Sequence, residues 1–131
     1  METQATVSAY QRIGGDDGIK KLVDRFYDLM DELPEAYSAR KIHPKDLSLS
    51  NEKFCDFLSG WLGGPQRYVE KHGAPMLRRR HMPSAIGHDE RDQWLMCMKL
   101  ALADVVEDEL LRKELYTAFI KVADHMRNSA G

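Results

Sequence analysis

A single histidine, His81, follows a basic stretch in the sequence Leu-Arg-Arg-Arg-His-Met-Pro over residues 77–83. Trp94, thirteen residues later, opens an apolar helical pattern. A neutral imidazole on a loop beside an apolar helical pocket is the arrangement that binds haem iron. The same residues also fit a solvated basic surface on which His81 binds nothing. The residues around His81 leave both interpretations open.

The composition indicates one globular domain and excludes several classes of protein. The 131 residues suffice for a single core, and the formal net charge of -2 gives no general electrostatic attraction for nucleic acid. The N-terminus lacks the pattern of a signal peptide, and no apolar run is long enough to span a membrane. Cys55 and Cys97 lie within apolar helical runs, which indicates buried free thiols. We therefore expect a cytoplasmic protein without nucleic-acid or membrane partners.

Helical periodicity dominates the chain, whereas strand signals are almost absent. Gly14-Gly15 should separate a short helical turn over 8–13 from a long helix that ends near Pro34. A short turn over 35–41 follows. We expect the next helix to use Ser50 as its N-cap and to end at Gly63-Gly64-Pro65. A long helix opens at Asp89, and after a break near 107–108 the final helix carries an apolar stripe from Leu111 to Met126.

Residues 66–88 form the irregular part of the sequence, with room for one or two short turns and no long helix. Gly73, Pro75, Pro83 and Gly87 interrupt any periodic pattern there. An irregular stretch of this length is unusual inside a compact domain. It becomes acceptable when the segment packs against a group that is not protein, so the segment itself favours a bound prosthetic group.

Further motifs run through about residues 8–127. The most specific are Trp61-Leu62-Gly63-Gly64-Pro65, Arg80-His81-x-Pro83 and Glu90-Arg91-Asp92-x-Trp94-Leu95-x-Cys97-Met98. They are accompanied by Gly14-Gly15, Arg25-Phe26-Tyr27, His43-Pro44-x-Asp46-Leu47, Phe57-Leu58-x-Gly60 and Tyr68. In these motifs, and in their order and spacing, the chain resembles the group II truncated haemoglobins. The resemblance implies an all-α, truncated globin-like fold: a two-over-two helical sandwich around haem b (iron protoporphyrin IX). It also implies a single domain over 1–131, in which 1–7 form an N-terminal extension.

The resemblance also implies roles for four residues. His81 matches the proximal ligand of the haem iron. Tyr27 and Trp94 match distal residues whose O–H and N–H donate to a ligand on the iron. His43 lies where this family carries tyrosine, phenylalanine or histidine. As histidine it can donate to the ligand or to Tyr27, and direct ligation of the iron in the ligand-free state is an alternative.

The remaining cofactor contacts are expected on the pocket wall and at its rim. An ungapped match places three residues on the wall: Ser50, Phe54 and Phe57. Haem propionates require cations or hydroxyls at the rim, and the candidates there are Tyr68, Arg78 and Arg80, with His72 a weaker one. Met82 is expected to contact the haem by packing rather than as an axial ligand.

Three functions agree with this sequence. The first is reversible binding of dioxygen, carbon monoxide, nitric oxide or another diatomic ligand at a five-coordinate iron. The second is a haem redox enzyme, such as a peroxidase, nitric oxide dioxygenase or nitrite reductase. The chain carries no flavin or nicotinamide fingerprint, so that second function needs an unidentified external reductase. The third is a haem-free helical interaction module. The sequence leaves open whether the protein is a monomer or a homodimer.

Overall fold

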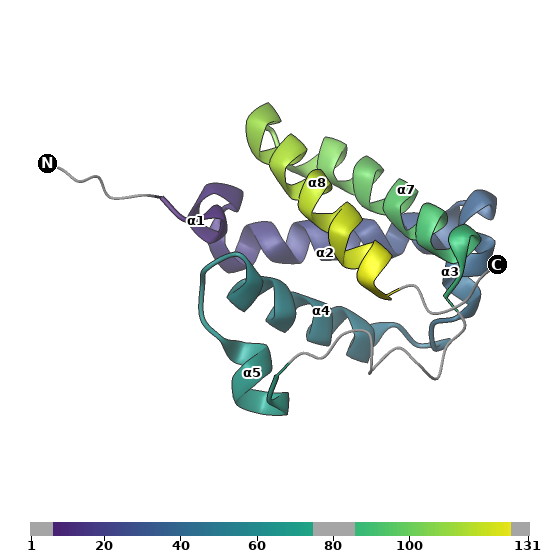
Figure 1. Ribbon diagram of the computed structural model, residues 1–131, viewed down its shortest axis with the longest axis horizontal. Coiled ribbons are helices and arrows are strands. Elements are labelled where there is room, and N and C mark those ends of the chain that lie inside the picture. The colour runs from purple at the N-terminus through teal and green to yellow at the C-terminus, as the bar shows by residue number, and fades with distance from the viewer. Residues whose placement is uncertain (1–6, 75–85, 127–131) are drawn as a thin grey trace, which may run out of the picture.

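The computed structural model describes residues 7–74 and 86–126, which fold into helices joined by short turns (Figure 1). The helices are α1 (Ala9–Ile13), α2 (Gly15–Glu32), η1 (Pro34–Ala36), α3 (Tyr37–Lys41), α4 (Ser48–Trp61), α5 (Arg67–His72), α7 (His88–Val105) and α8 (Glu109–Met126). Neither described range contains a strand. The predicted all-α class is confirmed.

Helix α2 is the central element, and its apolar stripe explains its position. Ile19, Leu22, Val23 and Phe26 recur at helical spacing and are fully or almost fully buried. The helix begins as expected after Gly14, which has a left-handed φ of 103° and ends α1. Two aspartates in the first turn of α2 face the positive end of the helix dipole.

The helices form two pairs, α2 with α4 and α7 with α8, and α2 also contacts α7 (Figure 1). The buried residues of these helices form one continuous hydrophobic core. A single stripe of each amphipathic helix can be buried only against another helix, so the four helices enclose the interior between the pairs. This is the expected two-over-two sandwich.

The turn after α4 shows why glycine and proline follow Trp61 directly. Gly63 has a left-handed φ of 96°, and a Cβ on Gly64 would lie 2.4 Å from Cδ1 of Tyr10. The Tyr10 amide donates to the carbonyl of Leu62 at 2.9 Å. Helix α1 therefore packs directly on this turn, and a side chain at position 64 would displace it.

The start of α4 differs from the expectation. The helix begins at Ser48 with Leu47 as its N-cap and no side-chain cap, so Ser50 lies inside the first turn. The Asp46 carboxylate accepts from the Ser48 amide at 2.9 Å, just before the helix. An aspartate can hold the chain in a turn ahead of a helix by this bond, and it replaces the cap predicted for Ser50. As predicted, residues 66–74 hold only a short helix, α5, and the long helix α7 begins at His88, one residue before the expected Asp89.

The Glu90-Arg91-Asp92 motif stabilises the start of α7. The Glu90 carboxylate accepts from the Gly87 amide at 2.7 Å and satisfies a donor ahead of the first turn. Arg91 pairs with Asp92 and, across to α8, with Asp124. The motif therefore caps α7 and links it to α8 through an ion pair. None of the helices in the described ranges is long and apolar enough to cross a membrane.

Candidate functional site

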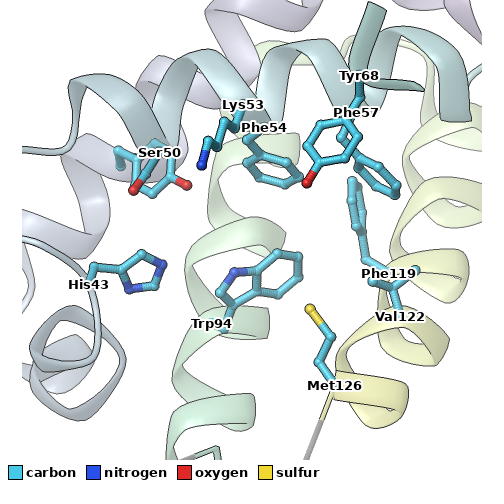
Figure 2. A pocket seen from close by; sticks show the side chains of 11 residues that line it. His43, Ser50, Lys53, Phe54, Phe57, Tyr68, Trp94, Phe119, Val122 and Met126 are labelled. Carbon is cyan, nitrogen blue, oxygen red and sulfur yellow. The ribbon is translucent and has the colours of Figure 1, made fainter. Parts of the chain in front are cut away.

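A cavity of about 400 Å³ lies between the two helix pairs (Figure 2). It is lined by Tyr27, His43, Ser50, Lys53, Phe54, Phe57, Tyr68, Trp94, Phe119, Val122 and Met126. The structure thus brings seven of the predicted site residues to one cavity: Tyr27, His43, Ser50, Phe54, Phe57, Tyr68 and Trp94.

Tyr27 reaches the cavity from the inner face of α2. The residue is 8 % exposed, and its ring packs edge-on against Phe26, with ring centroids 5.0 Å apart. Burial raises the pKa of the Tyr27 phenol well above its usual range. The hydroxyl therefore stays protonated and is available as a hydrogen-bond donor at any physiological pH.

His43 follows the short helix α3 and points into the cavity (Figure 2). Its Nδ1 lies 2.7 Å from the carbonyl oxygen of Ala39, and its ring centroid is 6.0 Å from that of Tyr27. The backbone after it is held by Arg40, which donates to the carbonyls of Pro44 and Lys45, both at 2.8 Å. These bonds restrict both the ring and the chain that carries it.

Trp94 lies in the second turn of α7 and has aromatic neighbours on several sides. Its ring centroid is 5.1 Å from that of Phe26, 5.7 Å from that of Phe119 and 6.0 Å from that of Phe54. Figure 2 shows the indole nitrogen on the side of the ring that faces His43. Packing fixes the ring plane, and the indole N–H is a donor only. Trp94 is therefore both a packing residue and a polar one.

The α4 side of the cavity is aromatic. Phe54 and Phe57 line it, and both are half-buried because they pack against the core on one side and face the cavity on the other. Phe57 stacks on Trp61 with ring centroids 6.0 Å apart, and its ring lies edge-on to Tyr68 at 6.3 Å. Ser50 adds a small hydroxyl at the start of the same helix face.

Four predicted site residues lie outside the described ranges: Arg78, Arg80, His81 and Met82. His88 and His125 are exposed, and Met98 is fully buried in the core. The weaker rim candidate His72 is exposed and contacts the ring of Tyr68, with centroids 4.8 Å apart, but does not line the cavity.

The sequence interpretation missed four residues of the cavity: Lys53, Phe119, Val122 and Met126. Lys53 is three residues after Ser50 and precedes Phe54, so helical spacing could have placed it on the same face. The other three belong to the apolar stripe that predicted α8, and nothing in the sequence indicated that part of this stripe lines a cavity. Spacing identifies such a stripe but does not distinguish core from cavity wall.

The lining combines broad aromatic walls with a few polar groups that converge on one region. A cavity of this size and character suits a flat, mostly apolar group rather than a polar metabolite. Three side chains can exchange hydrogen bonds with a small polar ligand: Tyr27, His43 and Trp94. Lys53, an exposed residue that lines the cavity, adds a cation beside Ser50 and Phe54 (Figure 2). These residues fit haem, with its apolar ring and anionic propionates.

Comparisons with known proteins agree with this fit. The profile of the bacterial-like globin family matches residues 8–128. A group II 2-on-2 haemoglobin of Agrobacterium tumefaciens is 50% identical, with a TM-score of 0.94 over 98% of this chain and 99% of its own. A group 2 truncated haemoglobin of Bacillus subtilis (strain 168) is 38% identical over 95% of this chain and 92% of its own length.

A solved structure described as the truncated oxygen-avid haemoglobin of Bacillus subtilis is also similar. It is 38% identical, with a TM-score of 0.84 over 93% of this chain and all of its own. Sequence family, overall fold and the cavity between the helix pairs thus agree. The chain belongs to the bacterial-like globins, among the group II truncated haemoglobins, which bind small diatomic ligands at haem.

Proposed function

We propose that this protein binds dioxygen and other diatomic ligands reversibly at haem b. His81 would hold the iron from the proximal side and leave it five-coordinate when no ligand is bound. The observation that carries the proposal is one cavity in which Tyr27, His43 and Trp94 meet between aromatic walls. The description of the similar Bacillus subtilis protein as oxygen-avid supports dioxygen as the ligand.

The cofactor and the residues of the chain would have different roles in ligand binding. When bound, haem supplies the iron that coordinates the ligand. From α2, Tyr27 would donate a hydrogen bond to the ligand, and its raised pKa keeps the hydroxyl protonated. Trp94 offers a second donor from α7, and the aromatic walls exclude bulk water. A donor stabilises dioxygen, which carries partial negative charge when coordinated, more than it stabilises carbon monoxide.

The proposal is tested by purifying the protein and recording its absorbance with and without carbon monoxide. We expect a red protein with about one haem per chain and a Soret band that shifts when carbon monoxide is added. A folded, colourless protein that takes up no hemin would contradict haem binding altogether. Turnover of peroxide, nitrite or nitric oxide at rates that exceed dioxygen release would favour the redox alternative and its external reductase.

Lys53 gives a second test at the rim of the cavity, where we propose that it joins Tyr68, Arg78 and Arg80 in binding the propionates. Lys53→Ala should speed the loss of haem to a haem-scavenging acceptor about twofold to fivefold, the range of an exposed ion pair. Lys21→Ala removes an exposed lysine of α2 that does not line the cavity and is the matched control. Equal rates of haem loss in the two variants would show that Lys53 does not bind the propionates.

We also propose a cytoplasmic location and a monomeric or homodimeric state. Cys55 and Cys97 are both free, in agreement with a reducing compartment. Burial raises the pKa of each thiol to about 11, so both remain protonated and unreactive at neutral pH. Cys97 is buried as predicted, whereas Cys55 is only half-buried.

A further inference from the structure

The position of His43 depends on α3, a helix of only five residues. So short a helix is not stable by itself, and its orientation must come from contacts with its neighbours. Ala39, in the middle of α3, is completely buried. Its amide lies in the first turn, where backbone N–H groups lack a partner within the helix. A buried amide there requires a partner from outside.

That partner is Gln93, the residue immediately before Trp94. Its side-chain carbonyl Oε1 accepts from the Ala39 amide at 2.9 Å. The carbonyl of the same residue, Ala39, accepts from Nδ1 of His43 at 2.7 Å. Ala39 thus links a side chain of α7 to the imidazole ring at the edge of the cavity.

The second of these bonds decides which ring nitrogen of His43 carries the proton. A backbone carbonyl can only accept, so the bond requires a hydrogen on Nδ1. In a neutral imidazole the other nitrogen, Nε2, then has no hydrogen and is an acceptor. Figure 2 shows the ring directed into the cavity, with one nitrogen on the side of Trp94. A carbonyl bound to the far nitrogen is also the usual way in which proteins select a histidine tautomer.

We infer that Gln93 is a positioning residue, which holds α3 through Ala39 so that neutral His43 presents an unprotonated Nε2 to the cavity. His43 then acts as a hydrogen-bond acceptor, not as the donor that its residue type suggested. Tyr27 and Trp94 remain the two donors to the ligand. This assignment rests on the proposed function for its consequence, because a diatomic ligand in the cavity can only accept hydrogen bonds, and a neutral His43 with an unprotonated Nε2 offers it none.

The test is the tautomer of His43 in the carbon monoxide complex of the ¹⁵N-labelled protein, observed by long-range ¹H–¹⁵N correlation where the ring is neutral. The His43→Phe variant assigns the signals. We expect the pattern of a ring protonated at Nδ1 in the wild type. Gln93→Met keeps the volume but loses the strong acceptor, and should lose this pattern. Gln93→Glu restores an acceptor for the Ala39 amide and should recover it.

Amide exchange supplies an independent readout and a matched control. Loss of one hydrogen bond should speed exchange at Ala39 about threefold to tenfold in Gln93→Met and leave Gln93→Glu close to the wild type. Gln11 also accepts from a backbone amide with Oε1, that of Ser8 at the N-cap of α1, so Gln11→Met should change neither readout.

Two results would overturn the inference. One is a wild-type ring protonated at Nε2, a measurement that needs no variant to fold. The other is an unchanged tautomer in folded Gln93→Met. Both leave haem binding intact, whereas a protein that takes up no haem contradicts the proposed function instead.

Discussion

Replacing His81 by glycine is expected to remove most of the haem from this protein. The imidazole is proposed as the only bond from the chain to the iron, a coordinate bond. The other contacts between chain and haem would be packing and ion pairs at the rim. Purified His81→Gly should therefore contain a small fraction of the haem of the wild type. Added imidazole should restore binding, because the free ligand can enter the space that the side chain leaves. Absorbance in the Soret region measures both effects.

His88→Gly is the control for this experiment, since His88 is an exposed histidine at the first residue of α7. That variant should retain its haem without added imidazole. Wild-type haem content in His81→Gly would show that another residue holds the iron. His43 would then be the first candidate, because it is the only histidine that lines the described part of the cavity.

The second large effect concerns the rate at which dioxygen leaves. Tyr27→Phe and Trp94→Phe each remove one donor while they preserve an aromatic ring in the wall. A hydrogen bond to a charged partner contributes about 1.5–3 kcal/mol, so each variant should release dioxygen about tenfold to a hundredfold faster. The effects should not add in the double variant, because both donors act on one ligand.

Stopped-flow displacement of dioxygen by carbon monoxide measures these rates. Tyr116→Phe removes a hydroxyl from a half-buried tyrosine of α8 that does not line the cavity, and it should leave the rate unchanged. Release of carbon monoxide should change less than release of dioxygen, because carbon monoxide carries less negative charge than dioxygen when each is coordinated. Unchanged dioxygen release in both single variants would contradict the distal hydrogen-bond proposal.

Much of the fold was predictable, because long amphipathic helices have periodic sequences. The stripe of α2, from Ile19 to Met30, identified both the helix and the face that it buries. The first residue of α4 was harder to predict. Ser50 has the residue type of an N-cap, yet Asp46 forms the turn two residues before Ser48. Several polar residues in succession compete for that role, and local sequence does not rank them.

The cavity was only partly predictable for a related reason. Phe54 and Phe57 were expected on its wall, whereas Phe119, Val122 and Met126 were recognised only as part of the apolar stripe of the final helix. Apolar side chains follow the same helical spacing whether they meet other protein atoms or enclose a cavity. Lys53 has a charged group on a long apolar stem, so its place at the rim depends on how α4 is set against its neighbours.

The sequence by itself determined which helices form, because apolar periodicity is local, and which polar residue types are available near the cavity. Only the tertiary structure decided how one of them is protonated. The link from Gln93 to Ala39 joins residues 54 positions apart and brings α7 against α3. The bond from His43 to the Ala39 carbonyl then assigns the ring proton to Nδ1. A tautomer depends on the partner of each nitrogen, and that partner is set by how the helices pack.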